Sequence, residues 1–309
     1  MKVLVTGGAG FLGSHVVDRL LLRGDQVLVL DHLKAKRERF VPKGVQVIQM
    51  AVEDPQVIDA IVQEAPDVVV HLAAQISVTQ SVEDPAFDAR VNVIGALHVL
   101  QGAVKARVKR LVFASSGGAI YGDHPARPTA EERDVLPLSP YGIAKQTFEH
   151  YLESAALHCG ISTISLRFSN IYGPRQQAVG GYAGVLPAFL SRLKTGERAT
   201  IFGDGTSTRD YVFVGDAADA ILLAIDSKET GIVNISSGKE TAVRTLWDKL
   251  LTLHGKPHEV EHAPGRPGEV LRSHLDPSQA KKRLRWRAKT SLREGLAQTY
   301  DWFMGRKGE

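Results

Sequence analysis

The stretch Thr6-Gly7-Gly8-Ala9-Gly10-Phe11-Leu12-Gly13 decides the fold. It directly follows a short apolar run and leads into the amphipathic segment Phe11–Arg23, which predicts a strand, a glycine turn and a helix in that order. Gly7 permits the tight turn, Gly10 lets backbone N–H groups approach a pyrophosphate, and Gly13 lets the helix pack closely on the strand. These residues predict the phosphate-binding turn of a dinucleotide site.

Asp31 supplies the second half of the dinucleotide signal. It follows the apolar strand Gln26–Leu30, about 20 residues after the glycine turn, where a carboxylate accepts hydrogen bonds from the ribose hydroxyls of adenosine. Because a carboxylate repels the 2′-phosphate of NADP, we expect NAD as the cofactor. The nearby Lys34, Lys36 and Arg37 are interpreted as a solvated surface run.

Short apolar runs and longer amphipathic segments alternate from the glycine turn to residue 167. The runs are almost entirely apolar, which is typical of strands covered on both faces. We therefore expect an α/β fold with a Rossmann-type, doubly wound parallel sheet in residues 1–168. Residues 169–309 are expected to form a smaller mixed α/β substrate-binding lobe, with some exchange of chain between the lobes. The expected strands are Lys2–Thr6, Gln26–Leu30, Val45–Gln49, Asp67–Leu72, Arg110–Ala114 and Ile161–Arg167, and the expected helices are Phe11–Arg23, Pro55–Glu64, Pro85–Ala106, Pro140–His158, Gly184–Lys194, Val214–Ile225, Val243–Leu253, Pro277–Leu284 and Ser291–Phe303.

The composition is that of a globular protein. The 309 residues are 43% hydrophobic and 23% charged, and 38 Lys and Arg against 34 Asp and Glu give a net charge of +4. The basic residues are dispersed apart from one group, Lys281, Lys282, Arg283, Arg285 and Arg287, so we expect no nucleic-acid partner. No stretch approaches the roughly 18 apolar residues of a membrane span, and the single Cys159 fits a reducing cytoplasm.

Three regularly spaced histidines raise the alternative that the protein binds a metal ion. His254, His258 and His262 recur every four residues. Gly255 and Pro257 interrupt the helix that would align them, so we interpret them as exposed histidines and expect no metal.

Tyr141 and Lys145 carry the chemistry expected beside the dinucleotide. They lie four residues apart at the start of a helix, after Ser139 as a cap and Pro140 in the first turn, so one helix face carries both. A lysine ammonium beside a tyrosine, helped by the positive nicotinamide of NAD⁺, lowers the phenol pKa and makes the phenolate a usable base. An isolated pair with this spacing is more often an ordinary surface pair, but together with the glycine turn it indicates a catalytic one.

Further motifs follow in a fixed order along the chain: His71-Leu72-Ala73-Ala74, Asn92-Val93-Ile94-Gly95, Ser115-Ser116-Gly117-Gly118-Ala119-Ile120-Tyr121-Gly122, Leu166-Arg167-Phe168-Ser169-Asn170-Ile171-Tyr172-Gly173-Pro174-Arg175 and Arg209-Asp210-Tyr211-Val212. The chain thereby resembles, over nearly its whole length, the extended short-chain dehydrogenase/reductases that act on nucleotide sugars, and among them the bacterial UDP-glucose 4-epimerases. The resemblance implies that bound NAD oxidises C4 of a UDP-hexose and that the 4-keto sugar turns over and takes the hydride back on its other face. It also implies a homodimer built by helices such as Pro85–Ala106 and Pro140–His158.

The resemblance assigns the catalytic and cofactor-binding residues. Tyr141 looks like the base for the 4-hydroxyl proton, and Lys145 like the residue that holds the cofactor ribose. The family's catalytic Ser/Thr is replaced by Gly117, so we expect Ser116 to take its role, through a bulge at Gly117 and Gly118. The expected NAD contacts are Gly7, Gly10, Phe11, Leu12, Gly13, Asp31, His32, Val52, Leu72, Ala73, Ala74, Asn92, Ser115, Tyr141, Lys145 and Phe168; Ala51 replaces the family's aspartate near the adenine, which leaves Val52 and Asp54.

The substrate contacts are carried over in the same way. Asn170, Arg209 and Arg266 resemble the groups that hold the diphosphate, because planar donors suit phosphate oxygens. The expected set is Ser116, Tyr141, Asn170, Val185, Phe202 beside the uracil, Arg209, Arg266, Glu269 at the nucleotide ribose, and Ser273. Ser273 stands where some relatives have an aromatic residue, so it leaves room for an N-acetyl group on the sugar.

Other functions remain open on the same scaffold. A sugar-nucleotide 4,6-dehydratase needs an acidic pair where Gly118 and Ala119 stand, and the same absence weakens a UDP-glucuronate decarboxylase. An epimerase of another nucleotide sugar stays possible. A non-catalytic NAD-binding regulator is the alternative from a different class, against which the retained Tyr141 and Lys145 argue.

Overall fold

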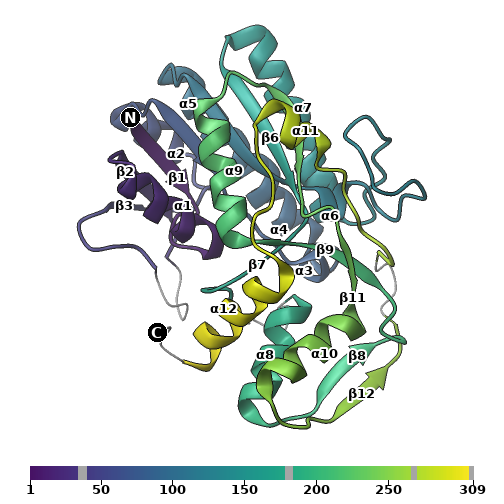
Figure 1. The fold of residues 1–309 in the computed structure, drawn as a ribbon. Helices are drawn as coiled ribbons and strands as arrows, with labels where there is room; N and C mark the ends of the chain where they lie inside the picture. Colours follow the sequence, from purple (N-terminus) through teal and green to yellow (C-terminus); the bar gives the residue numbers. More distant parts are fainter. Residues whose placement is uncertain (34–39, 178–183, 266–269, 306–309) are drawn as a thin grey trace.

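Seven parallel strands form the central sheet of the described chain, which in this computed structural model comprises residues 1–33, 40–177, 184–265 and 270–305 (Figure 1). The strands run in the order β10-β6-β5-β4-β1-β2-β3, so the chain starts inside the sheet at β1 and moves outward on both sides of it. This is the doubly wound order that the apolar runs predict, and the Rossmann-type fold is confirmed. The strands are β1 (Lys2–Thr6), β2 (Gln26–Asp31), β3 (Gln46–Gln49), β4 (Val68–His71), β5 (Arg110–Ser116), β6 (Ser162–Phe168) and β10 (Gly231–Ile235).

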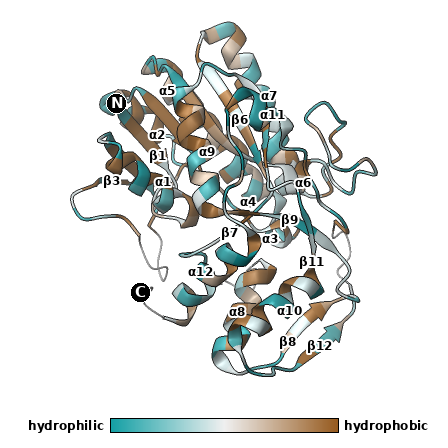
Figure 2. Cartoon of the chain, in the orientation of Figure 1, coloured by the Kyte–Doolittle hydropathy of each residue, from teal (hydrophilic) through white to brown (hydrophobic). Residues whose placement is uncertain are grey.

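Helices cover both faces of this sheet. Helices α1 (Phe11–Leu22) and α9 (Val214–Asp226) contact each other and bury one face, together with Trp286. Helices α2 (Val57–Glu64), α5 (Ala96–Lys105) and α7 (Pro140–Cys159) bury the other. The strands are mostly drawn in hydrophobic colours in Figure 2 because both of their faces are enclosed.

The expected helix Pro85–Ala106 is interrupted in the structure. It divides into α4 (Pro85–Ala89), a π-helix η1 (Arg90–Gly95) and α5. At its end, a Cβ on Gly95 would lie 2.9 Å from the Val52 side chain, so the missing side chain lets this helix approach the chain after β3 closely. Hydrophobic spacing did not reveal the wider turn, which places Asn92 in the interior; π-turns of this kind are frequent at functional sites.

The second lobe has its own core and two small sheets. One sheet has the order β11-β9-β7 and the other pairs β12 with β8. Its helices α8, α10 and α12 pack together around Phe189, Trp247 and Tyr300. The elements are β7 (Asn170–Tyr172), α8 (Val185–Thr195), β8 (Ala199–Phe202), β9 (Thr208–Phe213), β11 (Glu240–Ala242), α10 (Val243–His254), β12 (Val260–Ala263) and α12 (Leu292–Met304).

The chain passes between the lobes more than once. After β9, helix α9 and strand β10 return to the large sheet, and α11 (Ser278–Arg283) packs beside β10. Short elements α3 (Val78–Glu83) and α6 (Gly117–Ile120) follow β4 and β5 at the carboxyl edge of the sheet. Among the described helices, none has the length and apolar character needed to cross a membrane.

Candidate active site

The glycine turn after β1 is held by backbone contacts that exclude side chains. Gly7 has a positive φ of +69°, and a Cβ there would lie 2.8 Å from the Ala73 backbone nitrogen. A Cβ on Gly13 would lie 2.2 Å from the Gly7 carbonyl oxygen. Helix α1 starts after Gly10 without a side-chain cap, so its first-turn N–H groups face outward at the carboxyl edge of the sheet. An uncapped helix N-terminus behind a glycine cradle fits a pyrophosphate.

Asp31 lies at the carboxyl end of β2, next to this turn. Its two oxygens accept hydrogen bonds from the backbone N–H groups of Ala9 and Leu33, both at 3.1 Å. Burial raises the pKa of Asp31, but the hydrogen bonds from His32, Leu33 and Ala9 outweigh burial and lower it below its usual range. The carboxylate is therefore ionised and fixed in direction, as recognition of a ribose diol requires.

Thr6 and His71 join the ends of β1 and β4. Thr6 Oγ1 accepts the backbone N–H groups of Leu72 and Ala73, both at 3.2 Å, so its own proton goes to His71 Nδ1 at 2.7 Å. His71 is therefore neutral with its proton on Nε2, and burial together with the charge of Lys145 lowers its pKa to about 3. Thr6 was not predicted as a site residue, although it begins the quoted glycine motif.

Tyr141, Lys145 and Ser116 meet where β5 ends against α7. Ser139 caps α7 by accepting the Gly142 N–H at 3.2 Å, and Lys145, one turn after Tyr141, donates from Nζ to the Ala114 carbonyl at 2.9 Å. The Lys145 ammonium lies 5.8 Å from the centre of the Tyr141 ring. Burial raises the pKa of Tyr141 to about 12, and a hydrogen bond from Ser116 acts in the opposite sense. The structure thus brings together all three residues predicted to be catalytic.

Ser116 reaches Tyr141 without the bulge that we expected at the two glycines. Strand β5 stays in regular register to its last residue, where Ser116 pairs with Phe168. Gly117 instead opens the short helix α6, and a Cβ there would lie 2.4 Å from the Leu275 side chain. The missing side chain at Gly117 therefore makes room for a segment of the second lobe.

A buried charge network lies next to the residues that are predicted to be catalytic. Glu149 accepts a hydrogen bond from Ser115 at 2.6 Å and binds Arg167 at 2.6 Å, and both charged residues are at most 3% exposed. Arg167 also donates to the Tyr121 hydroxyl at 2.8 Å. The two ions neutralise each other in the interior, and their bonds fix β5, β6 and α7 relative to one another.

Asn92 on the π-helix holds the loop after β4. Its side chain exchanges two hydrogen bonds with the Gln75 backbone, at 2.9 and 3.0 Å. Asn92 and Gln75 then both donate to one oxygen of Asp88, at 2.9 and 2.8 Å. Neither Gln75 nor Asp88 was predicted, although the spacing of four between Asp88 and Asn92 was visible in the sequence.

The predicted cofactor residues all lie at or just beyond one edge of the sheet. They fall in the β1–α1 turn, after β2, β3 and β4, at the ends of β5 and β6, on η1 and at the start of α7. Val52 is buried against Gly95, while Ala73 and Ala74 continue the chain beyond His71. Parallel strands bring their carboxyl ends to a common edge, which is where ligands bind in such sheets.

Asn170 and Ser273 lie together on the substrate side. Asn170 Oδ1 and Ser273 Oγ are 3.6 and 3.9 Å from the position that a Cβ on Gly118 would take. Ser273 is 6% exposed, and its backbone N–H donates to the Thr208 carbonyl at 3.2 Å. Two residues of the second lobe thus border Gly118, just after Ser116.

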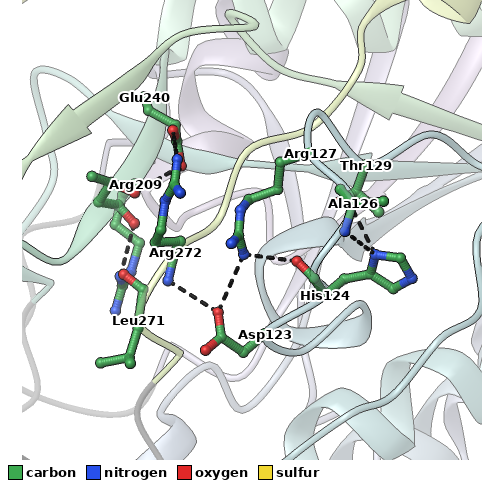
Figure 3. Close-up of polar contacts among 10 residues, drawn as sticks. Asp123, His124, Ala126, Arg127, Thr129, Arg209, Glu240, Leu271 and Arg272 are labelled. Atoms are coloured by element: carbon green, nitrogen blue, oxygen red, sulfur yellow. Dashed lines mark hydrogen bonds and ion pairs between the residues drawn. The ribbon is translucent and has the colours of Figure 1, made fainter.

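Arg209 lies beside a cluster of charged residues, Asp123, Glu240 and Arg272, that links the two lobes (Figure 3). Its guanidinium donates to the carbonyls of Thr208 and Leu271, at 2.9 and 3.4 Å. Nearby, Arg272 binds Glu240 through its side chain and donates its backbone N–H to Asp123 of the large lobe at 3.3 Å. The neighbouring Asp210 is completely buried and accepts from Ser237, so it points away from this cluster.

Of the remaining residues predicted to bind substrate, two lie in the described part of the chain and two lie outside it. Phe202 ends β8 and is 37% exposed, so it is not an ordinary core aromatic residue. Val185 begins α8. Arg266 and Glu269 lie outside the described residues. The three histidines bind different groups: His254 the Tyr300 hydroxyl, His258 the Glu197 carbonyl and His262 the Gly203 carbonyl.

Known proteins are similar to this chain over nearly its whole length. The UDP-glucose 4-epimerase of Mycolicibacterium smegmatis is 39% identical over 312 residues, which cover 99% of both chains. The structure of UDP-glucose 4-epimerase from Thermotoga maritima with UDP-glucose is similar with a TM-score of 0.95 and 43% identity, over 98% of both chains. The NAD complex of UDP-glucose 4-epimerase from Thermus thermophilus gives a TM-score of 0.93 and 43% identity, over 99% of both chains.

The family assignment rests on most of the chain. Residues 3–236 match the NAD dependent epimerase/dehydratase family. The matched region contains the glycine turn, Asp31, Ser116, Tyr141 and Lys145. The chain therefore belongs to the NAD dependent epimerase/dehydratase family.

Proposed function

We propose that the protein is an NAD-dependent UDP-glucose 4-epimerase. The observation that carries the proposal is the meeting of Ser116, Tyr141 and Lys145 at the sheet edge that also holds the glycine turn. The relatives with UDP-glucose and with NAD support the same substrate and cofactor. NAD, when bound, accepts the hydride from C4 of the hexose and returns it.

Tyr141 and its neighbours handle the proton of the sugar's 4-hydroxyl. The Tyr141 phenolate takes this proton as the C4 hydride leaves, and the phenol gives it back to the 4-keto oxygen on return. Ser116 donates to the phenolate oxygen and passes the proton between sugar and tyrosine. Lys145 stabilises the phenolate by its charge and binds the ribose hydroxyls next to the nicotinamide.

The nucleotide is held apart from the reacting carbon. Asn170, Arg209 and Arg266 bind the diphosphate. Phe202 and Glu269 bind the uridine. Val185 lies beside the bound nucleotide. Binding energy from this non-reacting part positions the hexose, while the ring itself stays free to turn over after oxidation.

Ser273 extends the substrate range to N-acetylated sugars. A bulky side chain here would crowd an acetamido group at C2, and overpacking typically costs about 1–3 kcal/mol. The protein then interconverts UDP-N-acetylglucosamine and UDP-N-acetylgalactosamine as well as UDP-glucose and UDP-galactose. Comparing both reactions in wild type and Ser273→Tyr tests this: loss of the N-acetyl reaction alone supports the role, and equal loss of both contradicts it.

The working unit is a homodimer in the cytoplasm. Apolar side chains are exposed on the helices at the α7 side of the sheet, among them Val82 on α3, Ile94 on η1 and Ile143 on α7. Helix α7 contacts both α3 and η1, so a second copy of the same surface would cover the exposed residues. Cys159 as the single cysteine fits a reducing compartment.

The dehydratase alternative lacks its acid pair in the structure as well. Gly118 and Ala119 lie in the short helix α6, where a Cβ on Gly118 would face Asn170 and Ser273 rather than a carboxylate. The direct test of the function is incubation of the purified protein with UDP-galactose and no added NAD. Formation of UDP-glucose supports the proposal; an unchanged substrate, or release of a 4-keto-6-deoxy sugar, contradicts it.

A further inference from the structure

Asp88 is a buried carboxylate beside the catalytic residues for which the mechanism above has no use. It lies on α4, which packs against α7, and it is 1% exposed. Its Oδ1 accepts from Gln75 Nε2 and Asn92 Nδ2, whereas its Oδ2 has no hydrogen-bond partner among the described residues. Such an oxygen is costly in the interior unless a charge faces it.

The donors around Asp88 are neutral and fully used. The second N–H of Gln75 goes to the Ser77 carbonyl at 2.9 Å, and the second N–H of Asn92 to the Gln75 carbonyl at 2.9 Å. The two amides therefore fix the direction of the Asp88 side chain but cannot neutralise its charge. Burial raises the pKa of Asp88, and among the described residues Lys145 is the cation whose charge opposes this increase.

The other carboxylate near Lys145 is already paired. Glu149 binds Arg167 through both of its oxygens, at 3.0 and 2.6 Å, and Ser115 at 2.6 Å. Of the remaining titratable groups next to Lys145, His71 is neutral and Tyr141 is a protonated phenol. Asp88 is thus the carboxylate whose charge is left to balance the Lys145 ammonium.

We propose that Asp88 is a positioning residue of the active site, which acts as the counter-ion of Lys145 and keeps its ammonium charged beside Tyr141. Burial lowers the pKa of Lys145 to about 8, and the charges of Asp88 and Glu149 oppose this decrease. Burial raises the pKa of Tyr141 most, and Asp88 adds to that increase. On this proposal the charged Lys145 that Asp88 maintains stabilises the phenolate and so opposes both increases in the Tyr141 pKa.

Removing the Asp88 charge should shift the basic limb of the pH profile. The Lys145 ammonium is present below its pKa and is lost as pH rises through it, so a lower pKa moves the limb to lower pH. We expect Asp88→Asn to shift the limb of kcat/KM down by about one pH unit. At pH 8 this is roughly a fivefold loss, and at pH 6 the two proteins should differ little.

Asp84→Asn is the matched control. Asp84 caps the same short helix by accepting the Phe87 N–H at 2.8 Å, and it is exposed. This variant makes the same change of charge four residues away. The basic limb of its kcat/KM profile should stay at the wild-type pH. A merely structural role of Asp88 would instead lower kcat/KM equally at all pH values, which would overturn the proposal.

The pKa of Lys145 can also be measured without turnover, which separates this inference from the proposed epimerase function on which its kinetic arm rests. The ¹³Cε shift of Lys145, assigned with Lys145→Arg, is followed against pH in protein with labelled lysine. A lower midpoint in Asp88→Asn supports the counter-ion even if wild type shows no epimerase activity, and an unchanged midpoint overturns it. Should Asp88→Asn fail to fold, Asp88→Ser carries the same prediction.

Discussion

Tyr141 is not available as a base until its surroundings gain positive charge. Burial raises its pKa to about 12, so the phenol is protonated at neutral pH in the protein alone. Lys145 lies close enough to the ring to stabilise the phenolate, and the positive nicotinamide adds to its effect. Proton removal from the sugar is therefore coupled to the presence of the oxidised cofactor.

Tyr141→Phe should retain NAD and the sugar nucleotide but lose turnover. The variant keeps the ring and removes only the hydroxyl that exchanges the proton, which typically costs about 10²–10⁴ in rate. Steady-state kcat with UDP-galactose, together with the NAD content of the purified protein, checks this. Near-normal kcat in the variant would rule out Tyr141 as the base.

Ser116→Ala should lower kcat well below that of wild type. It removes the hydrogen bond to Tyr141 while leaving the register of β5 unchanged. Thr79→Ala on α3 is the control, because this hydroxyl is not assigned to the site. Equal activity of the two variants would show that another group shuttles the proton.

Single residues were predicted where a sequence motif implied them. The spacing of Tyr141 and Lys145 and the glycine turn could be read directly, and Ser116 does bond Tyr141, although without the bulge that was expected at the two glycines. Asp88 and Gln75 were missed because buried polar side chains that bond one another leave no periodic pattern in the sequence.

The turn between β1 and α1 can fold tightly because Gly7 and Gly13 have no side chains. Helix α1 can begin directly after Gly10 only because the turn folds back to within contact of Gly13. The same turn places the helix N-terminus at the carboxyl edge of the sheet, where the cofactor pyrophosphate is predicted to bind. Packing and binding therefore share the same glycines.

Gly13→Ala should weaken NAD retention and destabilise the protein. Its Cβ would lie 2.2 Å from the Gly7 carbonyl, so the turn or the helix has to move, at a typical cost of about 1–3 kcal/mol. Thermal unfolding and the bound NAD content measure the two effects. Leu22→Ala, at an 88% exposed position of the same helix, is the control; a Gly13→Ala protein equal to it in both respects would contradict the packing argument.

Element boundaries could be predicted closely where apolar periodicity is strong. The expected strands of the large sheet agree with the structure to within two residues at each end, because buried parallel strands are continuous apolar runs. The π-helix could not be predicted in this way, since its wider turn depends on Asn92 and Gly95 meeting distant segments.

The molecule as a whole brings buried titratable groups from several elements to one edge. His71 packs between Phe113 and Phe148, with ring centres 5.7 and 5.5 Å away, and its pKa is lowered to about 3. In the unfolded chain a histidine titrates near 6.5, so the unfolded state binds more protons between these two values. The folded protein must therefore lose stability as pH falls through this range.

Equilibrium unfolding at several pH values should show this loss. His71 contributes up to about 1.4 kcal/mol per pH unit to the decline below pH 6.5, and nothing to the slope above it. His71→Phe, which cannot titrate, should show a shallower decline although it is less stable at neutral pH. Parallel curves for the two proteins would mean that His71 is not held neutral.

The return of the chain to the large lobe is a feature of the whole molecule. Helix α9 follows a strand of the second lobe in sequence but packs on α1 and the large sheet (Figure 1). Sequence order indicated that the lobes exchange chain but not which elements cross. The pairing of β10 with β6 depends on residues more than 60 positions apart, for which local spacing carries no information.

Retention of the C4 hydrogen tests the account most directly. The purified protein is given UDP-galactose with deuterium at C4 and no added NAD, and the UDP-glucose formed is analysed for the label. If the hydride leaves C4 and returns to the same carbon in a closed site, the product keeps its deuterium at C4. Loss of the label to water, or no conversion at all, would contradict the account.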